Sequence, residues 1–198
     1  MLADVEAAYR EGVSFEDYKS GLRVHADAFA VVYDRLAFVR EQAGQAPLGA
    51  GRILVLTEAY CIDSVLNLPL IGRLTEASPL ANLRIVSRDA HAALAALFPG
   101  RGGVSRLPTV IFLDEPRHVV GHWSERSKRD HEWMAGFLAQ NPMPEFVLDD
   151  GHPTPILARW MATRLASQLP FLEAVGWREV CDELAAIVTP AAHTHTPA

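Results

Sequence analysis

Two cysteines carry the most nucleophilic side chains of this sequence. Cys61 lies in the segment EAYCIDS, residues 58–64, between a short apolar run and a helical pattern, so we expect it at the start of a helix. Unpaired backbone N–H groups and the helix dipole stabilise a thiolate there, and the thiolate is the nucleophile of disulfide exchange. Glu58 and Asp63 oppose the thiolate, so spacing leaves the net pKa shift open. The alternative is a buried structural cysteine.

The residues after Cys61 each allow two interpretations. Asp63 could tune the thiolate or cap the helix and compete for the same amides. Ser64 could hydrogen-bond the thiolate and lower its pKa, or act as a helix cap. Cys181 lies beside the apolar face of an amphipathic pattern, which indicates a residue at the edge of the core. Whether it reaches Cys61 stays open, because a disulfide needs two Cα atoms within about 7 Å.

Short apolar runs alternate with helical patterns around Cys61 and predict the elements that position it. The expected strands are 53–56, 83–86, 109–113 and 119–123, and the expected helices are 64–77, 91–98 and 128–140. The order β-α-β-α-β-β-α predicts an α/β fold with a mixed four-stranded sheet and helices on both faces. Helical spacing within the first 45 residues, after a cap-like Ser14, and over 156–168 and 171–187 predicts additional helices at both ends.

Length and composition set the broad class. The chain of 198 residues predicts a single domain, 1–198, with its core at about 52–140, a helical extension at 1–50, another at 142–188, and a disordered tail at 189–198. Its 18 basic and 24 acidic side chains give a net charge of −6, which argues against nucleic-acid binding. Without a membrane-length apolar run or a signal-like N-terminus, the expected location is the cytoplasm, away from membranes.

The histidines and the charged segments predict no cofactor site. His118 and His122 share a face of the last strand, but no cysteine or carboxylate lies at metal-binding spacing, so we expect no metal and no cofactor. The mixed-charge segment 124–130 is expected to be a solvated face. Arg88 and Arg126 could attract an anionic thiol, although ion pairs with neighbouring acids are the simpler expectation.

Several residues around Cys61 together resemble a thioredoxin-fold protein. An aromatic residue precedes the cysteine, a proline follows it by eight residues, an apolar-Pro-Thr segment precedes the third strand, and a glycine lies in the last strand. These positions are Tyr60, Pro69, Leu107, Pro108, Thr109 and Gly121. The resemblance implies a cis peptide bond at Pro108 beside the thiol. It also implies a substrate groove formed by Tyr60, Leu107, Pro108 and Thr109.

A longer set of matches resembles a sparsely described bacterial branch of the thioredoxin-like superfamily. The branch pattern T-E-x-W-C-x-D corresponds to residues 57–63, and later N-x-P, R-D and I-P-x-x-x-F-L-D patterns correspond to 67–69, 88–89 and 107–114. Three departures matter. Ser64 replaces the second cysteine of a C-x-x-C pair, Tyr60 replaces tryptophan, and Val55 replaces the buried acid of many thioredoxins.

The resemblance and its departures together imply monothiol chemistry. Cys61 would form a mixed disulfide with a protein disulfide or a low-molecular-weight thiol, and an external thiol would resolve it. Asp63 and Ser64 would tune the thiolate. The alternative is a redox-inactive binding module, favoured by Ser64 at the position of the resolving cysteine. The terminal helices could cover the sheet edge or form a homodimer interface.

Overall fold

The sheet that carries the Cys61 turn has four strands in the order β2-β1-β3-β4. A computed structural model describes residues 2–44, 47–49, 51–114 and 118–189. The strands are β1 (Gly51–Thr57), β2 (Ala81–Ser87), β3 (Thr109–Leu113) and β4 (Val119–Ser124). β1 runs parallel to β2 and antiparallel to β3, and β3 runs antiparallel to β4. The predicted α/β fold with a mixed four-stranded sheet is confirmed.

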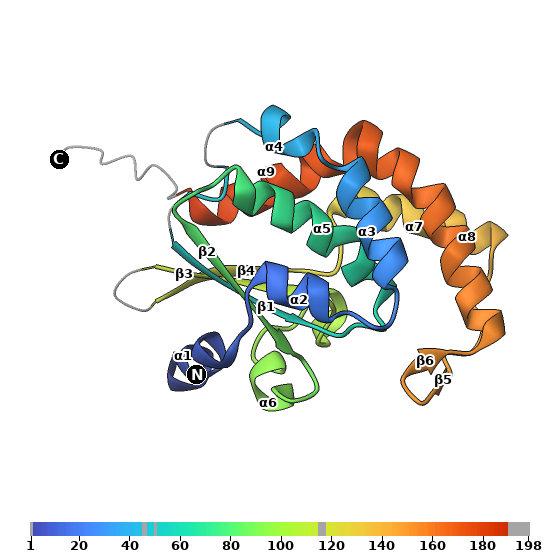
Figure 1. The fold of residues 1–198 in the computed structure, drawn as a ribbon, viewed down its shortest axis with the longest axis horizontal. Helices are drawn as coiled ribbons and strands as arrows, with labels where there is room; N and C mark the ends of the chain where they lie inside the picture. Colours follow the sequence, from blue (N-terminus) through green and yellow to red (C-terminus); the bar gives the residue numbers. More distant parts are fainter. Residues whose placement is uncertain (1, 45–46, 50, 115–117, 190–198) are drawn as a thin grey trace.

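Helices cover both faces of this sheet (Figure 1). One layer contains α3 (Ala26–Arg35), α4 (Val39–Gln42), α5 (Ile62–Glu76), α7 (Lys128–Gln140), α8 (Pro155–Phe171) and α9 (Trp177–Val188), and the other contains α1 (Leu2–Glu11) and α6 (Ala92–Ala95). Because side chains alternate along a strand, Ile53 and Val55 join the core under the first layer, whereas Leu54 and Leu56 join the core under α1 and α6. Burial on both faces explains the continuous apolar run of β1.

The N-terminal helical pattern is divided into short helices. Ser14 caps α2 (Phe15–Gly21) by accepting a hydrogen bond from the backbone N–H of Asp17 at 3.1 Å. α2 ends at Leu22, whose backbone is extended, and His25 adopts a left-handed conformation with φ of 59° before α3. The expectation of helix throughout the first 45 residues is therefore too simple, because periodicity continues across breaks in the backbone.

The C-terminal helices are joined where the sequence suggested a break. Pro170 lies inside α8, and a π-helical turn, Leu172–Gly176, follows directly and leads into α9. Such turns are a known way for a helix to accommodate a local interruption. The expected tail falls almost entirely on residues 190–198, outside the described residues. In the described part of the chain, no helix combines the length and apolar character needed to cross a membrane.

Two glycine substitutions test how the N-terminal helices hold α5. A Cβ atom on Gly72 of α5 would collide with the ring of Phe15 from α2, whereas a Cβ on Gly136 of α7 meets open space. We expect Gly72→Ala to destabilise the protein by roughly 1–3 kcal/mol through this overpacking. The matched control Gly136→Ala should stabilise it by up to about 1 kcal/mol through helix propensity. Urea unfolding measures both changes, and a Gly72→Ala variant as stable as the parent would contradict this packing.

Candidate functional site

Cys61 lies at the N-terminal cap position of α5, directly after the turn that leaves β1. Its backbone is extended, and its side chain makes no capping hydrogen bond. The sulfur lies 3.8 Å from the backbone oxygen of Leu107, and the peptide bond between Leu107 and Pro108 is cis. The fold thus brings together two segments that are 46 residues apart in sequence.

The environment of Cys61 raises the pKa of its thiol to about 11. Burial is the largest cause, followed by the negative charge of Asp63. The hydroxyl of Ser64 and the backbone N–H groups of Asp63 and Ser64 act in the opposite direction and are outweighed. The helix N-terminus therefore favours the thiolate as expected, but desolvation decides the direction of the shift.

Ser64 and Thr109 are anchored inside the protein. The Thr57 hydroxyl donates a hydrogen bond of 2.7 Å to the Ser64 oxygen, and the Thr109 hydroxyl donates one of 2.6 Å to the backbone oxygen of Arg106. Ser64 is 2% exposed and Thr109 is fully buried. Ser64 thus links the end of β1 to the first turn of α5.

The Asp63 carboxylate is held by two arginines and does not cap α5. Arg126 Nε donates to it at 2.8 Å, and Arg164 of α8 pairs with both of its oxygens. These two guanidinium groups lower the pKa of Asp63 despite its burial. Asp63 therefore stays ionised beside Cys61, and the cap that the sequence left open for it is not formed.

Two further buried polar side chains, Gln168 and Asp130, extend this hydrogen-bond network from Arg164. Arg164 Nε donates to the Gln168 side chain at 2.9 Å, and Gln168 donates to Asp130 at 2.5 Å. Asp130 also belongs to the first turn of α7, where its backbone N–H donates to the capping hydroxyl of Ser127. The expectation that 124–130 forms a solvated face is wrong for Glu125, Ser127 and Asp130, which are buried, and holds only for Lys128 and Arg129, which are exposed. The Ser-x-x-Asp spacing of 127–130 is a helix-start signal in the sequence from which the cap by Ser127, though not the contact to Gln168, could have been predicted.

A pocket of about 270 Å³ is lined in part by Cys61. Its apolar wall consists of Tyr60, Ile62, Met134, Leu138, Met143, Phe146, Trp160 and Met161, and its charged part of Asp63, Arg106, Glu125, Arg126 and Arg164. Of the predicted groove residues, Tyr60 lines the pocket, Leu107 contacts the sulfur, and Pro108 and Thr109 are not among the lining residues that the structure describes. The sequence analysis did not predict that the methionines, the α8 side chains and the charged part of the pocket lie near Cys61, because only the fold brings them there.

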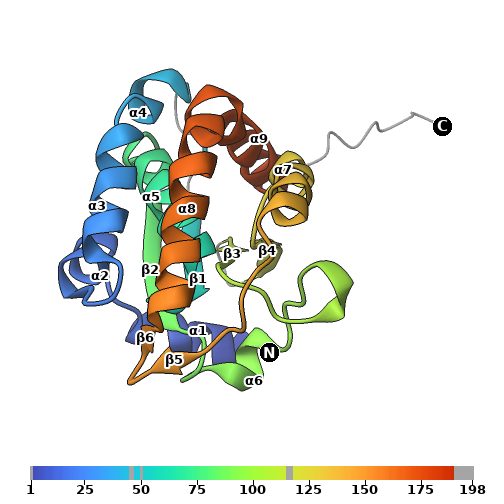
Figure 2. The ribbon, with the colours of Figure 1, turned by 90° about the vertical axis from the view of Figure 1, so that its right-hand side faces the viewer.

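The segment between α7 and the small hairpin of β5 (Leu148–Asp149) and β6 (His152–Pro153) runs along α8 (Figure 2). The indole N–H of Trp160 donates to the backbone oxygen of Asn141 at 3.0 Å. The ring of Phe146 contacts the ring of Tyr60 edge to face, with centroids 6.0 Å apart. This segment therefore joins α8 to the Cys61 turn and forms part of the pocket wall.

Arg88, near the Cys61 turn, is paired with a neighbouring acid as expected. Arg88 pairs with Asp89 at 2.6 Å and donates to the Tyr60 hydroxyl at 3.0 Å.

Both cysteines are free thiols. Cys181 is 8% exposed and lies on the side of α9 that faces the core. Among the described residues, no three histidine, cysteine or acidic side chains gather as they would around a metal ion.

The buried Asp130 should make stability depend on pH. Its pKa is raised to about 6, chiefly by burial and by the charge of Asp63. An acid whose pKa is raised on folding contributes its full stability below the unfolded value of about 3.9 and loses it as the pH rises through the folded value. We therefore expect Asp130→Asn to gain on the order of 2–3 kcal/mol relative to the parent between pH 4 and pH 7.

The pKa of Asp63 is lowered, so its ionisation makes stability rise with pH, opposite to Asp130. Both the parent and Asp130→Asn contain Asp63, so the difference between their stabilities reports on Asp130. Denaturant unfolding at several pH values measures the difference, and asparagine keeps the oxygen that accepts from Gln168. A difference that stays constant with pH would show that Asp130 titrates as an ordinary surface acid.

Comparison with known proteins agrees with this geometry. A family model described as "Thioredoxin" matches residues 12–141. A solved structure of a protein of unknown function from Pseudomonas aeruginosa is similar, with a TM-score of 0.58, 19% identity, and coverage of 91% of this chain and 94% of that one. An HIV epitope-scaffold is similar with a TM-score of 0.57, 20% identity, and coverage of 94% and 98%. At 19% and 20% identity, the two structures support the fold alone. No curated protein matches the chain.

Proposed function

Because the chain belongs to the thioredoxin family, we propose that it is a monothiol thiol–disulfide oxidoreductase with Cys61 as its nucleophile. One observation carries this proposal: Cys61 is partly exposed and lines a pocket at the N-terminus of α5, and its sulfur lies beside the Leu107 backbone oxygen. Ser64 stands three residues later, so an intramolecular C-x-x-C cycle is not available. The motif at 57–63 and this single cysteine support assignment to the bacterial branch that the sequence resembles.

The exchange proceeds in two balanced steps. Cys61 loses its proton to solvent, and its thiolate attacks one sulfur of a ligand disulfide. A bond forms between the Cys61 sulfur and that sulfur, the ligand disulfide bond breaks, and the leaving thiolate takes up a proton. A low-molecular-weight thiol then attacks the mixed disulfide, forms a new disulfide with the ligand half, and releases Cys61 as a thiolate that is reprotonated.

The raised pKa of Cys61 shapes both steps. At neutral pH few molecules carry the thiolate, so the first attack is slow, although each thiolate is strongly nucleophilic. In the mixed disulfide a sulfur of high pKa is a poor leaving group, so attack that expels Cys61 is also slow. The site therefore favours a persistent mixed disulfide over rapid turnover.

The second candidate is a binding module that has kept the fold without the redox cycle. The same raised pKa favours it, because a desolvated thiol beside Asp63 resembles a structural cysteine. The predominantly apolar wall of the pocket also suits ligand binding without chemistry. In this case Cys61→Ser leaves ligand affinity intact and no covalent adduct forms.

A thiol-release assay separates the two candidates. The protein is mixed with a small disulfide and an external thiol at pH 9, where part of Cys61 is ionised, and release of the ligand thiol is followed against a protein-free blank. We expect Cys61→Ser to fall to the blank rate and Cys181→Ser to match the parent, because Cys181 is buried in α9. A parent protein that equals the blank and carries no mixed disulfide on Cys61 by mass spectrometry would reject the oxidoreductase and leave the binding module.

A further inference from the structure

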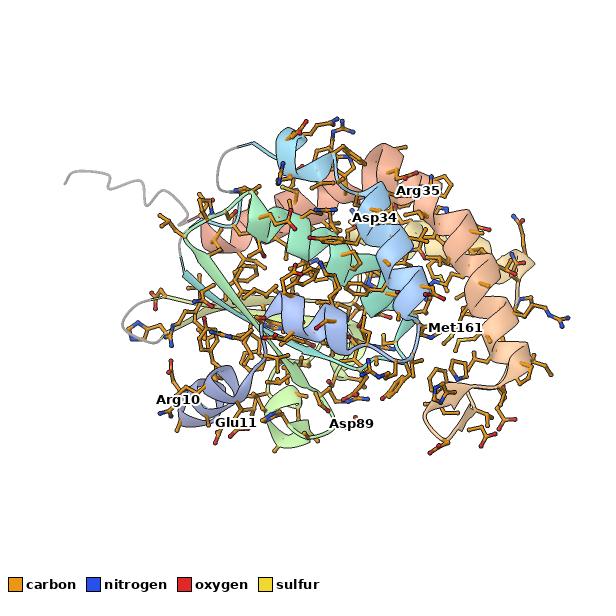
Figure 3. All side chains as sticks on the ribbon, viewed as in Figure 1. Arg10, Glu11, Asp34, Arg35, Asp89 and Met161 are labelled. Carbon is orange, nitrogen blue, oxygen red and sulfur yellow. The ribbon has the colours of Figure 1, made fainter. Side chains whose placement is uncertain are left out.

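Methionine is concentrated around the Cys61 sulfur. Three of the four methionines in the chain, Met134, Met143 and Met161, line this pocket. Met161 comes from α8 (Figure 3), Met134 from α7, and Met143 from the segment that follows α7. Methionine is flexible and polarizable, makes favourable contacts with aromatic rings, and is used on surfaces that bind varied apolar groups.

The mouth of the pocket leaves large apolar side chains open to solvent. Leu138 is 36% exposed, Met143 is 46% exposed and Phe146 is 47% exposed. Trp160 is 9% exposed, and its N–H is already satisfied by Asn141, so its ring offers apolar surface to the pocket. A compact apolar or aromatic group would cover this surface. The volume of about 270 Å³ is slightly below the range typical of drug-sized ligands, which favours one ring inside the pocket. The second half of an aromatic disulfide would then lie outside the pocket.

The charges of the pocket leave Arg106 with the weakest partner. Arg126 and Arg164 share the Asp63 carboxylate, and Arg126 also pairs with Glu125. Arg106 approaches Glu125 only at 3.9 Å, and its side chain is 45% exposed. Asp130 accepts a hydrogen bond from Gln168 and is not among the residues that line the pocket. The rim thus presents a guanidinium that can pair with an anion entering from solvent.

We propose that this pocket takes a compact aromatic thiol or disulfide that bears a carboxylate, with its ring against Leu138, Met143 and Phe146 and above the buried Met134 and Met161, its carboxylate on Arg106 and its sulfur beside Cys61. This inference rests on the proposed function for its sulfur chemistry, but binding is separable from exchange. The Cys61→Ser protein cannot form the mixed disulfide and can still bind.

The binding test uses Cys61→Ser protein with carbon-13 labelled methionine methyl groups. It is titrated with dithiodibenzoate, with the neutral dithiodibenzamide, and with cationic aliphatic cystamine, and methyl signals are assigned by Met→Leu variants. We expect dithiodibenzoate to shift the signals of Met134, Met143 and Met161, and to bind roughly two- to fivefold more tightly than the amide, as an exposed ion pair allows. Cystamine should shift them little.

A matched pair of arginine variants tests the carboxylate contact. Arg106→Gln should remove the preference for the acid over the amide, whereas Arg101→Gln should retain it, because Arg101 is exposed in the same loop and does not line the pocket. Equal shifts with cystamine, no shift with dithiodibenzoate, or a preference that survives Arg106→Gln would overturn the inference. Selective binding to Cys61→Ser without any adduct on the parent would support this ligand class and reject the oxidoreductase. Adducts on Cys61 of the parent protein, without selective binding to Cys61→Ser, would support the oxidoreductase and reject this ligand class.

Discussion

Asp63→Asn is expected to cost the protein about 3–5 kcal/mol of unfolding free energy, the usual cost of removing one partner from a buried ion pair. Asp63 is 8% exposed and Arg164 is 2% exposed, so the substitution leaves a guanidinium without its counter-charge inside the protein. Arg126 is less affected, because it also pairs with Glu125. Denaturant unfolding at pH 7 measures the loss.

Two further variants show whether the unpaired arginine causes this loss. Asp63→Asn combined with Arg164→Met should recover part of the stability, because the uncompensated charge is then removed. Asp182→Asn, on the exposed surface of α9, should change stability by less than about 0.5 kcal/mol. A loss in Asp63→Asn no larger than that of Asp182→Asn would show that the ion pair is not buried as described.

The rate of Cys61 alkylation by iodoacetamide should rise about tenfold per pH unit from pH 7 to pH 10, because only the thiolate reacts and its pKa is about 11. At pH 7 about one molecule in ten thousand then carries the thiolate, against about one in thirty for an ordinary thiol of pKa near 8.5. Peptide mass spectrometry follows each cysteine separately, and the urea-unfolded chain gives the ordinary rate for the same peptide.

Asp63→Asn should move this profile to lower pH, since it removes a negative charge that raises the Cys61 pKa. A plateau in the parent protein near pH 8 would mean that the helix N-terminus outweighs burial, contrary to the structure. Cys181 should remain slow at every pH, because it is buried in α9 and burial also raises its pKa.

The fold could be predicted because its signals are local. β1 is a continuous apolar run that is buried on both faces, and α7 covers the predicted residues Lys128–Gln140. The position of Cys61 at the start of α5 also followed from the strand-to-helix change in pattern. The expected separation of helices 156–168 and 171–187 is wrong, because α8 continues through Pro170 and a π turn then leads directly into α9.

The chemistry of the site was less accessible because its partners are distant in sequence. The arginines that hold Asp63 lie 63 and 101 residues away, and the second brings α8 under the site. The sequence shows acids beside Cys61 but not how deeply the sulfur is buried, and burial is the largest influence on its pKa. The extent of the single domain over 1–198, the cytoplasmic location of the protein and its homodimer interface stay predictions.

Detection of a mixed disulfide on Cys61 tests the proposed exchange directly. Reduced parent protein is incubated at pH 9 with a small disulfide, quenched with acid, digested and mapped by mass spectrometry, before and after addition of an external thiol. We expect an adduct on Cys61, little on Cys181, and loss of the adduct when the external thiol is added. If Cys61 stays unmodified while the same peptide in the unfolded chain reacts readily, Cys61 is a structural cysteine and does not exchange.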